Sequence, residues 1–407
     1  MTSASLLPSL YRYLRRPEKP KAMLKLLERL VCQESPSTDK AGLDRLARLL
    51  AGEWRRRGAR VRLLGSRSGG ALLRAEIFLG RGRPQGQLLV LGHLDTVYEA
   101  GTLKRMPFRV RGGRAYGPGS VDMKSGLVQA LFAVEALRAL RLGGQVFLPA
   151  RADRNVCPTN KEPSAKVVFL FTSDEEVGST VGRAVVEREA RRSRAVLVLE
   201  PASGLRGALK TARKGVGEFE LVVKGRAAHA GIEPEKGVSA TEELAAQIVR
   251  LKRLARPGRG LSVNVGVIEG GTRCNVVAER ARARIDVRIA RRADGPWIER
   301  RLRGLKAVNR RARLEVRGSV NRPPMERSAD GVRLFRHAQR LARALGIDLE
   351  EAATGGASDG NFTSALGVPT LDGLGGVGGG AHSPGEFVLV RRMPERAALL
   401  AALLLTV

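Results

Sequence analysis

The chain has 407 residues, more than one hydrophobic core usually supports, so we expect two domains or one domain with a large insertion. Its three cysteines, Cys32, Cys157 and Cys274, are too widely spaced for a CxxC pair, which argues against a thiolate metal site and a disulfide framework. The formal net charge of +32 is spread along the chain and aromatic residues make up only 4%, so no specific nucleic-acid site is expected. No apolar run is long enough to cross a membrane and the N-terminus lacks the apolar core of a secretion signal, so we expect a cytoplasmic protein.

The first half of the chain alternates between helical and strand patterns. Apolar residues at helical spacing predict two helices within residues 22–57 and another within 123–142. Residues 149–166, rich in proline and charge, predict a loop insertion. Short apolar runs predict buried strands at Leu72–Leu79, Leu88–Leu91, Val167–Phe171 and Val196–Leu199. This alternation predicts an α/β domain with a largely parallel sheet flanked by helices.

The pattern changes after Glu200, where amphipathic strands and helices replace the buried runs. A helical pattern resumes at Ser328 and leads to an apolar C-terminal helix. We therefore predict a discontinuous first domain, residues 1–204 and 319–407, with an inserted α+β domain of residues 205–318. The predicted elements of the insertion are strands at 218–224, 261–269 and 281–288 and helices at 240–254 and 297–305.

Histidines and carboxylates follow several of the predicted strands, where an open α/β sheet collects its functional groups. Because strand residues two apart point to the same side, Asp95 can hydrogen-bond the ring nitrogen of His93 that a metal leaves free. Imidazole and carboxylate ligands without cysteine suit zinc, cobalt or manganese in a catalytic site. The candidate ligands are His93, Asp122, Glu176, Glu200 and His382.

Five such ligands suffice for two divalent ions if one carboxylate bridges them, although the spacing does not assign each ligand to an ion. Glu175 stands next to Glu176, and at a turn the two side chains diverge, so Glu175 can take a proton from a metal-bound water. Alternatively, both are an acidic first helical turn favoured by the helix dipole. His337, on a helical pattern between arginines, is expected to be a surface or packing residue.

Five motifs together are more specific than any one of them: G-H-L-D-T-V-Y, Y-G-P-G-S-V-D-M-K-S-G, T-S-D-E-E-V-G, A-A-H-A-G and G-A-H-S-P-G-E. In this order they resemble the dinuclear zinc family of glutamate carboxypeptidase, acetylornithine deacetylase, succinyl-diaminopimelate desuccinylase and aminoacylase. The resemblance extends from about residue 20 to the end. The segments H-L-D-T-V-Y, M-P-F-R-V and A-Y-G-P-G are most similar to the glutamate carboxypeptidase branch.

The resemblance implies a role for each metal-site residue. Asp122 would bridge two zinc ions, with His93 and Glu200 on one ion and Glu176 and His382 on the other. Glu175 would be the general base and Asp95 the partner of His93. A cis peptide is implied between Asp122 and Met123, and Met123 itself departs from the branch, which often has a second aspartate there.

The resemblance also implies that the inserted domain is a ferredoxin-like lid that mediates a homodimer. His229 in A-A-H-A-G would reach across the dimer to polarise the scissile carbonyl. Asn275 and Arg288 match positions that hold the substrate carboxylate, a role that suits arginine. Lys210 and Arg322 are further candidates for substrate contact.

These features predict a metal-dependent hydrolase that cleaves the amide bond of a small peptide or N-acyl amino acid, next to a free carboxylate. One alternative is a deacylase of the acetylornithine or succinyl-diaminopimelate type, which uses the same metals. Another is a non-catalytic relative that binds peptides or nucleic acid, in which ligands or base would be damaged; none is damaged in this sequence.

Overall fold

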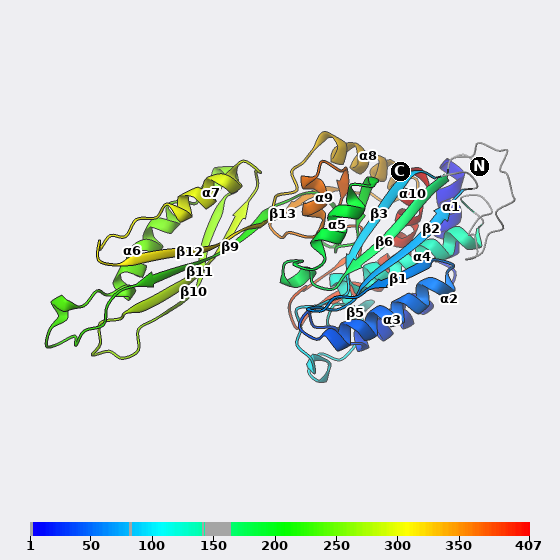
Figure 1. Cartoon of the computed structure of the whole chain (residues 1–407). Helices are drawn as coiled ribbons and strands as arrows, with labels where there is room; N and C mark the ends of the chain where they lie inside the picture. Colours follow the sequence, from blue (N-terminus) through cyan, green and yellow to red (C-terminus); the bar gives the residue numbers. More distant parts are fainter. Residues whose placement is uncertain (1–2, 81–83, 141, 143–163) are drawn as a thin grey trace. The chain divides into compact units, whose positions relative to one another are not determined.

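The computed structural model describes residues 3–80, 84–140, 142 and 164–407 (Figure 1). The chain divides into two compact domains, each considered by itself. The larger domain comprises residues 1–211, 327–353 and 358–407, and the inserted domain comprises residues 212–326 and 354–357. The inserted domain ends later than residue 318 because its last strand continues to Arg322.

A six-stranded mixed sheet forms the centre of the larger domain, in the order β1-β2-β6-β3-β7-β14. Neighbours β6, β3, β7 and β14 run parallel, whereas β1 and β2 are antiparallel at one edge. The strands are β1 Arg60–Leu64, β2 Leu72–Leu79, β3 Pro84–His93, β6 Ser164–Thr172, β7 Ser193–Val198 and β14 Thr370–Leu371. The four predicted strands are thus confirmed as β2, β3, β6 and β7. Residues 149–163 of the predicted loop lie outside the described residues. The remaining residues, from Ser164 on, belong to β6.

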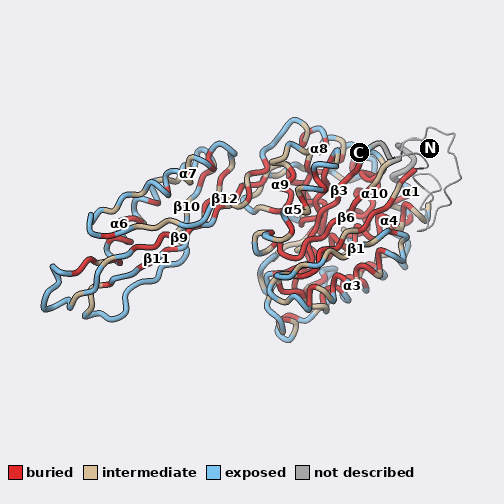
Figure 2. The backbone as a smooth tube through the Cα atoms, viewed as in Figure 1, coloured by how far each residue is buried: buried red, intermediate tan, exposed pale blue. Residues whose placement is uncertain are grey.

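Helices cover both faces of this sheet, and its inner strands are buried, whereas the edge strand β1 is partly exposed (Figures 1 and 2). Leu88 and Val90 of β3 belong to the core that contains α1–α4 and α10, whereas Leu89 and Leu91 pack with α5 on the other face. Burial on both faces explains why these strands are continuous apolar runs. The helices are α1 Ser3–Leu14, α2 Glu18–Cys32, α3 Lys40–Arg56, α4 Ser125–Ala139, α5 Arg183–Ala190, α8 Ala329–Arg343, α9 Gly360–Ala365 and α10 Met393–Thr406. None of the described helices is long and apolar enough to span a membrane.

Trp54 of α3 is the largest fully buried side chain in the core, and its ring centroid lies 4.3 Å from that of Phe169 on β6. We expect Trp54→Ala to lower the free energy of unfolding by about 3–5 kcal/mol, because it removes the contacts of a large ring and leaves a cavity. Urea denaturation measures this loss, with Trp54→Phe as a milder replacement. An unchanged unfolding midpoint in Trp54→Ala would contradict this packing.

Two further sheets are small. β8 Leu209–Arg213 pairs with β13 Glu351–Thr354. A four-stranded sheet has the order β15-β16-β5-β4, and none of its strands was predicted. Its strands are β4 Arg109–Arg111, β5 Arg114–Tyr116, β15 Gly378–Gly379 and β16 Phe387–Leu389. This sheet joins the segment before Asp122 to the segment after His382.

The inserted domain is an antiparallel sheet in the order β10-β11-β9-β12, with two helices packed on it (Figure 1). On β11, Ala281, Ala283 and Ile285 are buried in its core, while Arg282 and Arg284 between them are exposed. One face therefore supports the helices and the other is solvated. The elements are β9 Gly215–Lys224, α6 Ala240–Lys252, β10 Ser262–Gly270, β11 Arg280–Ile289, α7 Asp294–Arg303 and β12 Arg313–Arg322.

Candidate metal centre

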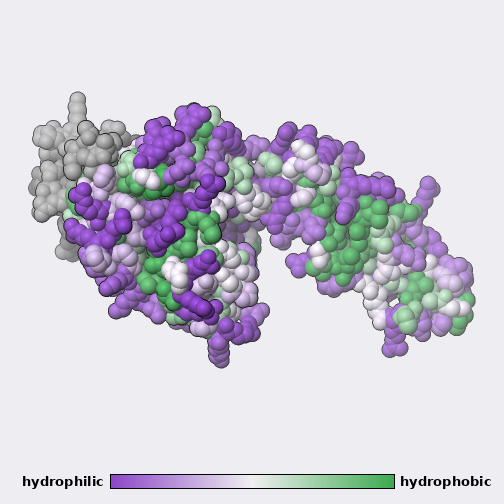
Figure 3. Space-filling view, turned by 180° about the vertical axis from the view of Figure 1, so that it is seen from behind, coloured by the Kyte–Doolittle hydropathy of each residue, from purple (hydrophilic) through white to green (hydrophobic). Residues whose placement is uncertain are grey.

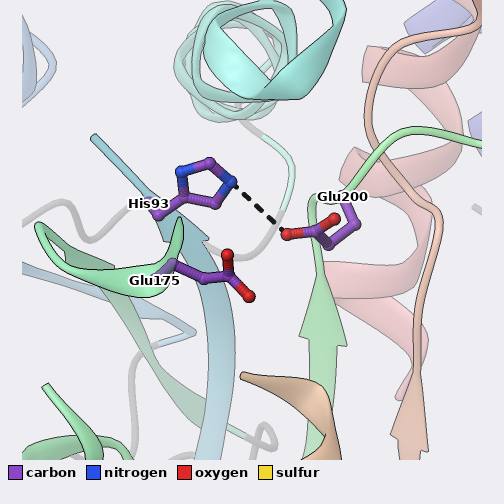
Figure 4. Close-up of side chains that lie close together, drawn as sticks. All are labelled: His93, Glu175 and Glu200. Atoms are coloured by element: carbon purple, nitrogen blue, oxygen red, sulfur yellow. Dashed lines mark ion pairs between the residues drawn. The ribbon is translucent and has the colours of Figure 1, made fainter. Parts of the chain in front are cut away.

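Three neighbouring strands end at the same edge of the large sheet and bring His93, Glu175 and Glu200 together (Figure 4). His93 is the last residue of β3, Glu175 follows β6 and Glu200 follows β7. His93 Nε2 lies 3.5 Å from Glu200 Oε1, and one ligand atom from each of the three residues lies within 4.8 Å of the others. All three side chains are buried, so their charges need a compensating partner such as a cation.

The two carboxylate oxygens of Asp122 face different histidines. Oδ1 lies 3.3 Å from His93 Nε2, while Oδ2 lies 3.4 Å from His382 Nε2. His382 Nε2 is in turn 3.3 Å from Glu176 Oε2. One carboxylate therefore stands between two groups of potential ligands, His93 with Glu200 and His382 with Glu176. The peptide bond between Asp122 and Met123 is cis, as the resemblance implied.

His382 adopts a left-handed backbone conformation, with φ of 61°. This conformation costs a non-glycine residue on the order of 1–3 kcal/mol, and such residues cluster at functional sites. Here it accompanies a side chain aimed at Asp122 and Glu176.

Asp95 connects His93 to the turn after β6. His93 Nδ1 lies 3.0 Å from the Asp95 carbonyl oxygen and 3.4 Å from its carboxylate. The same carboxylate accepts hydrogen bonds from the backbone N–H groups of Glu175 at 3.2 Å and Glu176 at 3.1 Å, and from the Ser37 hydroxyl at 2.7 Å. Asp95 therefore orients one histidine and also fixes the turn that carries both glutamates, a second role that the sequence did not reveal.

The carboxylates control the protonation of both histidines. Hydrogen bonds to Asp122 and Glu176 raise the pKa of His382 to about 10. Burial lowers the pKa of His93, but hydrogen bonds to Asp122, Asp95 and Glu200 outweigh it and leave that pKa well above its usual value. The histidines in turn hold the pKa of Asp122 below its usual range despite burial. The carboxylates thus favour a proton on each imidazole.

A metal ion must displace these protons, so we expect its binding to release protons at pH 7 and its affinity to fall as the pH is lowered from 8 to 6. The sign follows from the raised pKa of His382, which keeps the metal-free imidazole protonated below about 10. Calorimetry in two buffers of different ionisation enthalpy counts the protons. A binding heat that is independent of the buffer would contradict this competition.

Glu386 is a further residue next to these candidate ligands, and the sequence analysis did not single it out. It is fully buried, and its carboxylate accepts the backbone N–H groups of Val121 at 2.8 Å and Asp122 at 3.0 Å. Burial raises the pKa of Glu386, whereas hydrogen bonds from the Asp122 N–H, the Tyr98 hydroxyl and the Gly119 N–H oppose the rise. The available signal was an acidic residue in the loop that also carries His382, within G-A-H-S-P-G-E.

Of the substrate-contact candidates, His229, Asn275 and Arg288 lie in the inserted domain as expected. Arg322 belongs to the inserted domain rather than to the first one, whereas Lys210 is buried on β8 in the larger domain. His229 and Asn275 are neighbours, since Ala230 N donates to the Asn275 carbonyl oxygen at 3.0 Å. Arg288 lies on β11 and pairs with Asp286 at 2.8 Å. Arg322 is buried at the end of β12.

His337 was expected to pack or to lie at the surface. It lies on α8, and its Nε2 is 2.7 Å from the Thr406 hydroxyl of α10, so it contacts a neighbouring helix rather than the metal site.

Comparison with known proteins identifies the family of this chain. A model of peptidase family M20/M25/M40 matches residues 89–406. Carboxypeptidase G2 of Pseudomonas sp. (strain RS-16) is 29% identical over 394 residues, which cover 95% of this chain and 89% of that protein. The succinyl-diaminopimelate desuccinylase of Dechloromonas aromatica is 27% identical over 78% of this chain and 83% of its own length. The crystal structure of aminopeptidase PepT from Bacillus cereus has a TM-score of 0.76 at 22% identity and covers 94% of this chain and 97% of that one. The predicted resemblance is therefore confirmed: the chain belongs to peptidase family M20/M25/M40 and is one of its hydrolases.

Proposed function

We propose that this hydrolase uses two divalent metal ions, most readily zinc, to cleave an amide bond next to the free carboxylate of an amino acid. The observation that carries the proposal is the position of Asp122, whose Oδ1 faces His93 and whose Oδ2 faces His382. Glu200 completes the first group and Glu176 the second. Two imidazoles and three carboxylates without a thiolate form a donor set that suits zinc, cobalt or manganese.

When bound, two such ions supply a Lewis acid for the substrate carbonyl and lower the pKa of water toward neutrality. Glu175 is the proposed general base: it takes a proton from the attacking water and delivers it to the leaving amine. Its backbone N–H is held by the Asp95 carboxylate, which is tied to His93 as well. Asp95 thus fixes the position of the proposed base relative to His93.

His229 is the proposed donor to the oxygen that becomes negative as the amide is attacked. The Gly231 backbone N–H donates to His229 Nδ1 at 3.1 Å, so a neutral ring carries its proton on Nε2. Because His229 is exposed, this Nε2–H is accessible to a substrate or to another chain. Such a donor stabilises an oxyanion in the way that backbone N–H groups do in other hydrolases.

Asn275 and Arg288 are proposed to bind the free carboxylate of the substrate, with Lys210 and Arg322 as further contacts. The Arg288 guanidinium already pairs with Asp286, so a substrate carboxylate would share or replace this partner. Arginine suits the task because its planar donors match a carboxylate.

We further propose a homodimer formed through the inserted domain. β10 is an edge strand, and such an edge offers unpaired backbone groups to another chain. Val267 and Ile268 on it are exposed, and apolar surface is visible among the hydrophilic residues of this domain (Figure 3).

Hydrolysis assays on the metal-loaded protein test the proposal. Four substrate classes are compared: N-acyl glutamates, dipeptides, N-acetylornithine and N-succinyl-diaminopimelate, with release of the free amino acid as the readout. We expect cleavage of an N-acyl glutamate or a dipeptide, given the similarity to carboxypeptidase G2 over 95% of the chain. Turnover confined to the last two substrates would favour the deacylase alternative, to which the desuccinylase similarity points. No turnover in any class would refute the proposal.

A further inference from the structure

The Glu386 carboxylate accepts hydrogen bonds from three backbone N–H groups of the turn that presents Asp122. Its side chain is 0% exposed. Oε1 accepts from Val121 N at 2.8 Å and Asp122 N at 3.0 Å, and Oε2 accepts from Gly119 N at 2.9 Å. Three of the four consecutive residues that end at Asp122 are therefore tied to one carboxylate. Buried backbone N–H groups need such partners, and an ionised acceptor binds them more strongly than a neutral one.

The main chain of Glu386 is also fixed against this turn. β16 begins at the next residue and pairs with β5, so that Phe387 lies opposite Tyr116. Gly117 N donates to the Glu386 carbonyl oxygen at 3.3 Å, one step further along the same ladder. The backbone and side chain of Glu386 thus hold consecutive parts of one segment, from Gly117 to Asp122. A flexible surface carboxylate could not fix a turn in this way.

The same residue is tied to the loop of His382. Glu386 N donates to the Ser383 carbonyl oxygen at 3.1 Å. The Tyr98 hydroxyl lies 2.8 Å from Glu386 Oε2 and 2.9 Å from that same Ser383 oxygen, so its single proton bonds to one of them. Glu386 therefore contacts the turn of Asp122 directly and closes the loop that presents His382.

From these contacts we infer that Glu386 is a positioning residue, which sets the orientation of Asp122 and through it the affinity for both metal ions. The inference rests on the proposed function, in which Asp122 bridges the ions. A residue that oriented a single ligand would change the affinity for one ion only. A residue that merely stabilised the fold would change the unfolding temperature and leave both affinities alone.

The test is the dissociation constant of each zinc ion, measured by chelator competition on the full chain carrying Glu386→Gln. The glutamine keeps the acceptor for Val121 and Asp122, but its amide group meets the Gly119 N–H, so a donor faces a donor. We expect both dissociation constants to rise about 10- to 100-fold, the usual effect of losing a partner that orients a ligand. The visible spectrum of the cobalt-loaded variant should change as well, because the ligands around the ions are displaced.

Glu243→Gln is the matched control. Glu243 is a buried carboxylate of the inserted domain that accepts the backbone N–H groups of Val308 and Asn309, and it contacts no proposed ligand. The Glu243→Gln substitution removes the same charge and the same kind of hydrogen bond. Both zinc dissociation constants should nevertheless stay as in the unsubstituted protein. If Glu386→Gln does not fold, Tyr98→Phe replaces it, because this change deletes only the hydroxyl beside Glu386 Oε2. Both zinc dissociation constants should then rise, but by less than in Glu386→Gln.

Unchanged constants for both ions in Glu386→Gln, or in Tyr98→Phe when that variant stands in for it, would overturn the inference, and so would a change at one ion alone. Failure of the proposed function is recognised separately, in the unsubstituted protein. If that protein binds fewer than two zinc ions, the two-metal proposal and this inference fall together. If it binds two and the variant matches it, only the role of Glu386 is refuted.

Discussion

Replacing Glu175 by glutamine is expected to lower turnover by about 10²- to 10⁴-fold, the range that general acid–base catalysis contributes, while both metal ions stay bound. Glutamine has the shape of glutamate but cannot take up the proton of the attacking water. The structure makes this test informative, because the ligand atoms of Glu175, His93 and Glu200 all lie within 4.8 Å of one another. The geometry would also allow Glu175 to bind a metal ion itself.

Metal content by mass spectrometry, measured beside kcat on the same preparation, separates the two roles. Glu176→Gln is the adjacent comparison and should lose affinity for the ion that it shares with His382. If Glu175→Gln loses an ion, Glu175 is a ligand rather than the base. If it keeps both ions and full turnover, the base lies elsewhere.

Asp122→Ala should remove both ions together and reduce turnover below detection. The reason is that its two oxygens face two different groups of ligands, at 3.3 Å from His93 and 3.4 Å from His382. Deleting the carboxylate also removes the hydrogen bond that contributes most to the raised pKa of His382, so this imidazole loses its proton more readily. The lower proton competition does not restore metal binding, because the oxygen ligand common to both ions is gone.

Glu200→Ala is the comparison, because Glu200 lies next to His93 and not next to His382. This substitution should lower the affinity for one ion only. Titration calorimetry counts the sites in each variant. Retention of one tightly bound ion in Asp122→Ala would show that Asp122 serves a single ion and would contradict the bridging role.

The central sheet and the candidate ligands could be predicted from sequence because each leaves a local mark. β3, β6 and β7 are buried on both faces, so each is a short apolar run, and polar residues that follow such a run stand out. His93, Glu175 and Glu200 were found in this way, since parallel strands place their carboxyl ends at one edge of a sheet. The family resemblance then supplied the ligand pairing that spacing alone left open.

What the sequence did not show depends on pairing between distant segments. β5 and β16 have three residues each and lie more than 250 positions apart, too short to give a periodic pattern. The role of Glu386 depends on that pairing, so it could not be read from the residues around it. α1 was missed as well, because Pro8 lies inside it and interrupts the expected helical pattern. The second role of Asp95, holding the turn of Glu175 and Glu176, likewise connects segments 80 residues apart.

The most direct test of the two-metal account is a crystal structure of the zinc-loaded protein with diffraction data collected on both sides of the zinc absorption edge. We predict two anomalous peaks, one on each side of the Asp122 carboxylate, the first in contact with His93 and Glu200 and the second with Glu176 and His382. A single peak, or two peaks of which only one touches Asp122, would contradict the account.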